Sequence, residues 1–394
     1  MPFGRGLPPT VLKLGWISFF ADVCSEMVYP LLPLFLKSTL GAPAAVLGLI
    51  EGFAEATVSF VKGWSGFHSD QSGVRVPYIR WGYALSAIGK PMIGVAAVWS
   101  LVLLARVTDR VGKGVRTTAR DALIADAVEP QRRGEAFGFH RAMDTAGALV
   151  GVLFAAAFMA WMPGEYRAAF LWAGIPGFLA VALTFKLVEI RGKANSAPVR
   201  IPLRSILSRL SKSYYGALAL SSLFALASTS DSFLLLRARD MGFTELQVVA
   251  IYAVYNFTYM IFSSPLGRLS DRVGRWKVML PGWVIYALVY VGIALCQPGW
   301  MWALMGLYGV AIASNKGIGA ALMADHSPPE WRGSAMGFFN MVTGVVTLVA
   351  NVFTGWLYDG VGPRSAFLFA AICAVVGVIL APLILRRTPQ KAIS

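Results

Sequence analysis

One apolar stretch of the chain, residues 101–126, carries a row of charged and polar side chains. The row consists of Arg106, Asp109, Arg110, Lys113, Arg116, Thr117, Arg120 and Asp121. At 100° per residue, these side chains fall within about 140° of one helix face. Arginine and lysine so placed can make charge-assisted hydrogen bonds to an anionic group, and neighbouring acids can exchange protons. The spacing therefore indicates binding of an anionic solute with proton transfer beside it.

Two carboxylates one helical turn apart, Asp22 and Glu26, are the first candidates for proton exchange. No other charged residue occurs between Trp16 and Leu36. Two close carboxylates in a low-dielectric site are not readily ionised together, so one of them is expected to carry a proton. Substrate binding would fall to Arg110, Lys113 and Arg116. Further candidates for binding or coupling are Glu55, His140, Arg141, Asp144, Asp231, Asn315 and Lys316.

The same charges allow a second interpretation, in which they form a salt-bridge network that ties neighbouring helices together. Acids and bases occur in near balance, which suits such a network. We favour the network for Arg106, Arg120, Asp121 and Lys62, which lie nearer predicted helix ends. For His140 we favour packing or the network over a proton relay. For Asp22, Glu26, Arg110, Lys113 and Arg116 we favour substrate or proton binding.

The stretches that carry these groups are otherwise strongly apolar. Of the 394 residues, 57% are hydrophobic and 14% are charged, against about 25% charged in soluble domains. The mean hydropathy is +0.62. Too few polar residues remain to cover a soluble surface, so lipid must be the solvent. Twelve apolar stretches span roughly 11–36, 44–64, 78–97, 101–126, 136–160, 168–187, 212–236, 244–266, 275–296, 299–322, 333–357 and 364–387.

The net charge of +15 reflects membrane orientation and not nucleic-acid binding, because of where the basic residues lie. Most of them lie in the loops and helix ends of one side. The opposite loops hold Lys37, Arg167, Arg237, Arg239 and Arg364. By the positive-inside rule, both termini are expected in the cytoplasm, with the helices in the inner membrane. Membrane lipid is therefore an expected partner, and nucleic acid is not.

The sequence offers no support for an enzyme. It contains no nucleophile–base constellation, and Gly112-Lys113-Gly114 is too short for a phosphate-binding loop. Cys24, Cys296 and Cys373 lie far apart in apolar stretches, without metal-ligand spacing. We expect no catalytic residue, no metal and no cofactor.

Two passages of the chain repeat at an offset of about 200 residues. The turn Gly66-x-x-x-Asp70-x-x-Gly73 with Arg75 matches Gly267-x-x-x-Asp271-x-x-Gly274 with Arg275 and Lys277. Further along each half, residues 122–126 match 321–325. Glycine gives a short turn its backbone freedom, and aspartate can pair with an arginine or with helix amides. Two similar membrane halves, 1–188 and 213–394, are therefore expected, with a basic linker at 189–212 between them.

The duplicated turn, the basic linker and the twelve stretches together resemble the major facilitator superfamily over nearly the whole chain. Arg110 followed by Gly114 resembles the arginine motif in that family's fourth helix, and residues 25–30 and 112–116 resemble one prokaryotic branch. The resemblance implies an all-α polytopic fold of twelve transmembrane helices in two pseudo-symmetric six-helix bundles. It also implies a cytoplasmic gate formed by Gly66, Asp70, Gly73, Arg75, Gly267, Asp271, Gly274, Arg275 and Lys277.

Two departures from the family pattern bear on mechanism. Gln71 stands where the turn usually has a basic residue, and Val74 follows the first glycine directly. The family's antiporter motif needs a Gly-Pro pair, whereas residues 147–151 read Gly-Ala-Leu-Val-Gly. Export by antiport is therefore not indicated by a motif.

We expect a secondary active transporter that moves a small organic, anionic solute by alternating access. Proton coupling is the favoured energy source, and efflux is slightly favoured over import. The alternatives are an uncoupled facilitator or importer of the same fold and a non-transporting membrane receptor. The expected partners are a small-molecule substrate and protons, and the protein is expected to act as a monomer.

Overall fold

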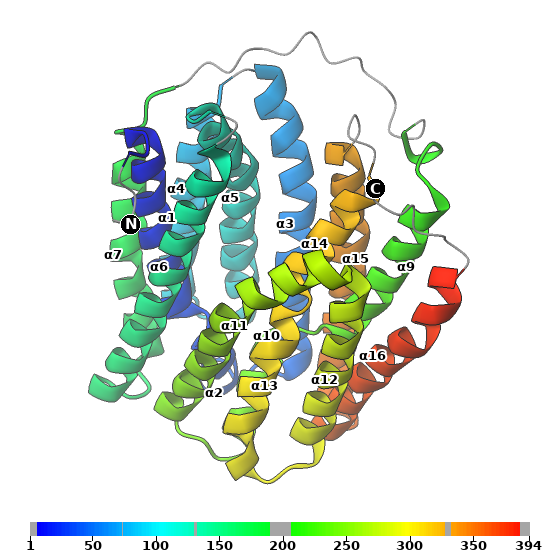
Figure 1. The fold of residues 1–394 in the computed structure, drawn as a ribbon. Coiled ribbons are helices and arrows are strands. Elements are labelled where there is room, and N and C mark those ends of the chain that lie inside the picture. The colour runs from blue at the N-terminus through cyan, green and yellow to red at the C-terminus, as the bar shows by residue number, and fades with distance from the viewer. Residues whose placement is uncertain (1–5, 73, 130–131, 190–205, 328–331, 387–394) are drawn as a thin grey trace. The chain divides into compact units, whose positions relative to one another are not determined.

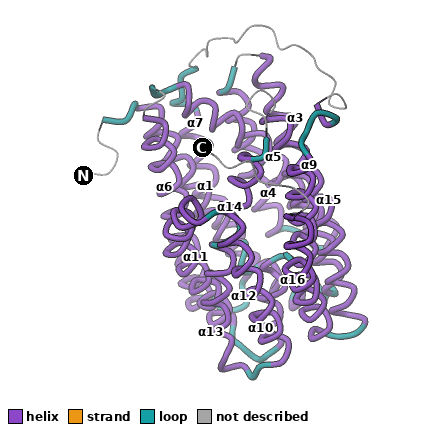
Figure 2. The backbone as a smooth tube through the Cα atoms, turned by 45° about the vertical axis from the view of Figure 1, so that its right-hand side comes forward, coloured by secondary structure: helices purple, strands orange, loops and turns teal. Residues whose placement is uncertain are grey.

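The computed structural model describes residues 6–72, 74–129, 132–189, 206–327 and 332–386, except for the side chains at 66–72, 134, 320, 332–333 and 386. Within these ranges all regular structure is helical, and no strand occurs (Figures 1 and 2). The chain divides into two compact units. Unit 1 comprises Met1–Ala42 and Phe53–Val199, and unit 2 comprises Pro43–Gly52 and Arg200–Ser394.

The helices follow one another as the apolar stretches predict. In unit 1 they are α1 (Pro9–Val28), α2 (Leu32–Ser38), most of α3 (Ala44–Ser72), α4 (Val76–Gly94), α5 (Trp99–Asp126), α6 (Arg133–Trp161) and α7 (Tyr166–Thr184). Unit 2 holds the first residues of α3 and then α9 (Lys212–Ala227), α10 (Asp231–Asp240), α11 (Glu245–Val273), α12 (Arg275–Leu295), the 3-10 helix η2 (Pro298–Trp300), α13 (Met301–Ala313), α14 (Lys316–Asp325), α15 (Arg332–Gly360) and α16 (Pro363–Arg386). Taking α1–α2, α9–α10 and α13–α14 as one span each, the twelve expected spans and the all-α fold are confirmed.

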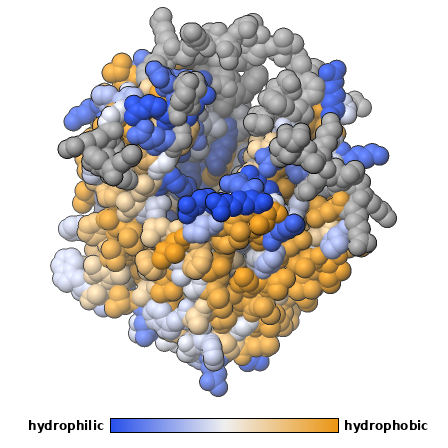
Figure 3. Space-filling view, viewed as in Figure 1, coloured by the Kyte–Doolittle hydropathy of each residue, from blue (hydrophilic) through white to orange (hydrophobic). Residues whose placement is uncertain are grey.

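The outer faces of the helices are apolar, as contact with lipid requires. Among the described residues, nine helical segments are long and apolar enough to cross a membrane. The α5 helix is not one of them, because its charged row interrupts the apolar sequence. Trp81 and Trp161 in unit 1 and Leu288 and Ile379 in unit 2 are each more than 60% exposed. Figure 3 shows apolar residues over much of the described surface.

Three spans expected as continuous helices are interrupted. The α1 and α2 helices part near Pro30, which has no backbone N–H to donate. The α9 and α10 helices part at residues 228–230, whose hydroxyl side chains compete for backbone hydrogen bonds. The α13 and α14 helices part at Ser314 and Asn315, whose side chains donate to the Ala311 carbonyl at 2.7 and 3.1 Å. Local polar chemistry thus ends helices that hydropathy alone would continue.

The two units pair their helices in the same way. In unit 1, α4 packs on α5 and α7, and α1 packs on α6 and α7. In unit 2 the spans at the same positions along the half pair alike. There, α12 packs on α13 and α16, and α9 packs on α15 and α16. The duplicated turn predicts two superposable halves, and this shared pairing is what such halves require.

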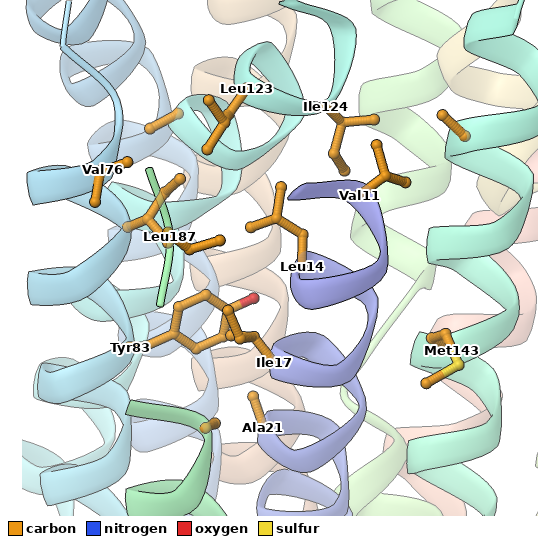
Figure 4. Close-up of a cluster of buried hydrophobic side chains, with 14 of the residues drawn as sticks. Val11, Leu14, Ile17, Ala21, Val76, Tyr83, Leu123, Ile124, Met143 and Leu187 are labelled. Carbon is orange, nitrogen blue, oxygen red and sulfur yellow. The ribbon is translucent and has the colours of Figure 1, made fainter. Parts of the chain in front are cut away.

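A close helix seam positions the charged row of α5. A Cβ at Gly82 of α4 would lie 2.7 Å from the Gly112 carbonyl oxygen, and a Cβ at Gly112 would lie 2.5 Å from the Gly82 carbonyl oxygen. Both positions therefore need glycine. The approach sets Arg116, one turn beyond Gly112, over the ring of Tyr83. Figure 4 shows Tyr83 beside Ile17 of α1 in the buried apolar core of unit 1.

Candidate functional site

Charged groups from four helices gather inside unit 1 and interact electrostatically, and this set is called the charge cluster below. Its members are Asp22 and Glu26 on α1, Glu55 and Lys62 on α3, Arg110, Lys113, Arg116, Arg120 and Asp121 on α5, and His140 and Asp144 on α6. The structure thus brings together the site residues predicted in the N-terminal half, apart from Arg141. Arg141 is exposed and lies outside this cluster.

The accessible part of the charge cluster lies at Glu55 and Lys113, on either side of the buried Arg110. Arg110 Nη2 lies 3.9 Å from Glu55 Oε1, and the Glu55 side chain is 48% exposed. Lys113, one turn further along α5, is exposed. The exposed Lys113 can attract an approaching anion, and Glu55 limits how strongly the buried Arg110 holds one.

The buried part of the charge cluster centres on Arg116. Its side chain is 4% exposed, and its guanidinium lies over the Tyr83 ring, 4.1 Å from the ring centroid. Its Nε and Nη1 atoms have no hydrogen-bond partner within the described part of the chain. Asp22 interacts electrostatically with Arg116 from α1. A buried cation with unmet donors is the strongest sign of an anion site in this unit.

His140 and Asp144 stand one turn apart on α6 and face the same interior. His140 Nδ1 lies 3.6 Å from Asp144 Oδ2, and the histidine is 4% exposed. Among the described groups, His140 Nε2 and Asp144 Oδ1 find no hydrogen-bond partner. Asp144 also interacts with Asp22. Two buried polar atoms with open bonding capacity suit proton exchange as well as a network.

An ion group around Asp109, which also interacts with Arg110 of the charge cluster, has the geometry of a structural network. Lys90 Nζ on α4 lies 2.6 Å from Asp109 Oδ1, and Arg106 Nη1 lies 3.7 Å from Asp109 Oδ2. Lys90 also donates to the Ser86 carbonyl at 3.1 Å. All three charged side chains are at least 90% buried. The α4–α5 seam holds these charges against one another, which leaves them little capacity for a solute.

A second paired group lies at the other end of the charged row. Arg120 Nη2 lies 2.9 Å from Asp121 Oδ1, and Arg120 Nη1 donates to Ser18 Oγ at 3.3 Å. Tyr83 donates to the same Ser18 oxygen at 3.5 Å. These contacts join α1, α4 and α5 beside Arg116.

Unit 2 presents a smaller polar group where its spans are interrupted. Asp231, the first residue of α10, accepts a 2.6 Å hydrogen bond from the Tyr308 hydroxyl and interacts with Lys316. Glu51 is buried, and its Oε2 accepts from Ser230 Oγ at 3.3 Å. Asp231 therefore joins α10 to α13 through Tyr308.

Asn315 and Lys316, the remaining predicted site residues of unit 2, differ in setting. Asn315 is buried, accepts from the Trp283 indole and donates to the Ala311 carbonyl. Lys316 is exposed. Asn315 therefore ends a helix, whereas Lys316 is exposed and interacts with Asp231.

Sequence reasoning missed Glu51 and Tyr308 as members of this group. Glu51 stands one turn before Glu55, but periodicity does not show that one is buried and the other exposed. Tyr308 carries no sequence signal that separates it from the other 12 of the 13 tyrosines.

The duplicated turn of unit 2 is built around Arg275. Arg275 pairs with Asp271, donates to Ser270 Oγ at 2.9 Å, and lies 3.1 Å through Nε from Asp325 Oδ2. Gly274 adopts a φ of +102°, which glycine accommodates. Gly267 is partly buried, and Lys277 is exposed. Asp325 is the last residue of the second repeated passage, residues 321–325. The pair between Arg275 and Asp325 therefore brings the two repeated passages of unit 2 together.

The turn of unit 1 joins the same kinds of group. Arg75 Nε lies 3.9 Å from Asp126 Oδ2, the counterpart of Asp325. The Glu189 carboxylate accepts from the backbone N–H groups of Arg75 and Val76, each at 2.8 Å, at the start of α4. Gly73 and the side chains of Gly66 and Asp70 lie outside the described residues. Sequence reasoning did not identify Asp126, Asp325 or Glu189 as partners, although the second repeated passage marks the first two.

No group of three or more His, Cys, Asp or Glu side chains in the described ranges is placed to hold a metal ion.

Comparisons with known proteins identify the family of the chain. A family model described as Major Facilitator Superfamily matches residues 14–249 and 217–393. An uncharacterised MFS-type transporter of Methanocaldococcus jannaschii is 31% identical over 384 residues, which is 95% of each chain. A probable 4-methylmuconolactone transporter of Cupriavidus pinatubonensis is 27% identical over 93% of this chain and 88% of its own. A multidrug resistance protein, MdtH of Photorhabdus laumondii, is 23% identical over 84% of this chain and 82% of its own.

The fold has solved counterparts. The crystal structure of the nucleoside transporter NupG superposes with a TM-score of 0.80 at 16% identity, covering 95% of this chain and 100% of that one. At this identity the likeness speaks for the fold alone. The family match along the chain and the relative at 31% identity show the family of the protein. The chain belongs to the major facilitator superfamily and is a membrane-embedded, multi-pass transporter, not an enzyme.

Proposed function

We propose that this transporter is secondary active, coupled to protons, and carries a small organic solute with an anionic group. The observation that carries the proposal is the buried Arg116, whose unmet donors lie among acids from α1 and α6. Cations with open donors bind anions, and neighbouring buried acids bind and release protons. The relative named for 4-methylmuconolactone supports a small organic solute.

Alternating access would move the two units about a midplane site, with the paired turns at Arg75 and Arg275 as the cytoplasmic gate. The positive-inside rule supports an inner-membrane location with both termini in the cytoplasm. Efflux is the favoured direction, in keeping with the relative named as a multidrug resistance protein. The protein acts as a monomer, with lipid around it.

Transport into proteoliposomes tests this proposal. Purified protein is reconstituted, a pH gradient is imposed, and radiolabelled 4-methylmuconolactone is the first solute, followed by a panel of small organic acids. Accumulation against the solute gradient, abolished by a protonophore, is the expected result. Flux that only equilibrates would assign an uncoupled facilitator. Binding without flux would favour a membrane receptor and overturn the proposal.

A further inference from the structure

The end of α7 is surrounded by basic side chains from three helices of unit 1. Lys13 Nζ of α1 donates to the Lys186 carbonyl at 2.9 Å, and Arg80 Nε of α4 donates to the Thr184 carbonyl at 3.4 Å. The Arg80 guanidinium also lies over the Phe185 ring, 5.1 Å from its centroid. The side chain of Lys186 is exposed beside them. Because α1, α4 and α7 pack on one another (Figure 1), three positive charges meet at one helix end.

These three residues, Lys13, Arg80 and Lys186, are called the basic patch below. Its hydrogen-bond donors exceed the acceptors around it. A lysine side chain carries three N–H donors and an arginine five. Among the described residues, Lys13 has one acceptor, Arg80 has one, and the Lys186 side chain has none. Most of the donors of the basic patch are therefore left for water or for a ligand.

Acidic side chains are absent from the segments that build the basic patch. Residues 6–21, 74–94 and 166–188 contain no Asp or Glu. The next acid along the chain is Glu189, and its carboxylate already accepts from the backbone N–H groups of Arg75 and Val76, each at 2.8 Å. The basic patch thus keeps a net positive charge, which favours an anionic ligand.

The basic patch lies where a membrane span ends. The helical segment Tyr166–Thr184 is long and apolar enough to cross a membrane, and the phosphates of phospholipids lie at the ends of such spans. Exposed aromatic side chains, typical of this interface, stand within three residues of each cation. They are Trp16 near Lys13, Trp81 next to Arg80 and Phe185 next to Lys186, with exposed fractions of 50%, 70% and 67%. Cations beside exposed aromatic rings suit a ligand that is anionic at one end and apolar at the other.

We propose that the basic patch binds the phosphate group of an anionic phospholipid, whose glycerol and acyl region contacts Trp16, Trp81 and Phe185. The oxygens of one phosphate accept charge-assisted hydrogen bonds from several cations at once. A lipid bound in this way joins α1, α4 and α7 and stabilises unit 1. This lipid site is independent of the transported solute and of the charge cluster.

A purely structural role for the same cations is the alternative. Basic side chains often satisfy the last carbonyl groups of a helix, as Lys13 and Arg80 do here. In that case Lys13→Gln and Arg80→Gln would lower the stability of the protein without lipid and leave lipid binding unchanged. Lys186→Gln separates the two roles best, because its side chain has no acceptor among the described residues.

Lipid binding to the purified protein in a neutral detergent tests the inference. Phosphatidylglycerol is the anionic probe, and phosphatidylcholine is the control with the same phosphodiester next to a quaternary ammonium. Native mass spectrometry counts the bound lipids, and thermal unfolding measures their effect on stability. Phosphatidylglycerol should bind saturably and raise the unfolding temperature more than phosphatidylcholine does. Inorganic phosphate and sodium chloride at matched ionic strength should not reproduce this increase.

Variants assign the binding to these side chains. Lys186→Gln should weaken phosphatidylglycerol binding by about fivefold and leave the unfolding temperature without lipid unchanged. The triple variant Lys13→Gln, Arg80→Gln and Lys186→Gln should weaken binding by roughly a hundredfold. Arg132→Gln is the matched control, because it removes an exposed cation of unit 1 that is paired with Glu135, and it should bind the lipid as the wild type does.

Each outcome decides the inference. Equal increases in unfolding temperature with the two lipids, or binding of phosphatidylglycerol retained in Lys186→Gln and in the triple variant, would overturn it. An equal loss of binding in Arg132→Gln would overturn it too, because the attraction would then come from the general charge of the surface. An increase produced by inorganic phosphate alone would assign a free anion to the site in place of a lipid. If the triple variant fails to fold, Lys186→Gln alone decides.

Discussion

Neutralising Asp109 should destabilise unit 1 more than any single change on its surface. Asp109 lies 2.6 Å from Lys90 and 3.7 Å from Arg106, and all three side chains are at least 90% buried. Asp109→Asn keeps the shape of the side chain but leaves two buried cations facing each other. Lys90→Met leaves Asp109 still paired with Arg106 and should therefore destabilise unit 1 less than Asp109→Asn does.

The distances give the order of magnitude. At an effective dielectric constant of about 20, the Coulomb attraction is about 6 kcal/mol at 2.6 Å and about 4.5 kcal/mol at 3.7 Å. Desolvation offsets much of this, and removing one partner of a buried pair costs about 3–5 kcal/mol. We expect a loss in that range for Asp109→Asn. Adding Lys90→Met to Asp109→Asn should return part of it, because one unpaired cation is then removed.

The free energy of unfolding in detergent, measured by titration with SDS, is the readout. Glu135→Gln is the matched control, because it neutralises an exposed carboxylate 2.9 Å from Arg132. An exposed pair of this kind contributes at most about 1 kcal/mol. Equal decreases in the free energy of unfolding for Asp109→Asn and Glu135→Gln would refute the reasoning. A further decrease in the free energy of unfolding when Lys90→Met is added to Asp109→Asn would also refute it.

Other predictions concern the turns, the α4–α5 seam and the coupling acids. Arg275→Gln breaks the pairs of Arg275 with Asp271 and Asp325. Single cysteines placed on each membrane face should then change in accessibility to thiol reagents, while binding of the transported solute persists. Unchanged accessibility would exclude a gate role. Glu189→Ala removes the cap of α4 and should cost about 0.5–2 kcal/mol in SDS unfolding, whereas no loss would show the cap to be dispensable. Gly112→Ala should unfold at lower denaturant than Gly138→Ala, where a Cβ meets nothing within 4 Å, and equal midpoints would contradict a close seam. Glu26→Gln should abolish proton-driven transport but spare exchange across equal gradients. Wild-type pH dependence in both Glu26→Gln and Asp22→Asn would place the proton site elsewhere, with Asp144 or Asp231 next.

Much of the architecture could be predicted because its causes are local. A lipid-spanning helix needs about 20 apolar residues, so the spans can be read from hydropathy. The repeated turn, with Gly274 at positive φ, marks the same corner in each half. The helix interruptions at residues 228–230 and at Asn315 also have local causes. The few hydroxyl and amide groups there change the average hydropathy of the span only slightly, so the hydropathy does not predict the interruptions.

The charged row illustrates what a sequence can and cannot decide about a site. Helical periodicity places Asp109 and Arg116 on one side of α5, and their chemistry marks both as candidates. Only the packed structure shows that Lys90 of α4 neutralises Asp109, whereas Tyr83 of the same helix covers Arg116 without accepting from it. Lys90 precedes Asp109 by 19 residues in the sequence, and Tyr83 precedes Arg116 by 33.

The sequence by itself determined the helical spans, and its repeats and charges predicted the two halves and the candidate residues for binding anions or protons. The tertiary structure decided which of those residues are already satisfied by the protein. The physical reason is that an apolar span depends on the solvent around one segment, whereas the state of a buried charge depends on the nearest atoms of other helices. The periodicity of a single helix carries no information about those atoms.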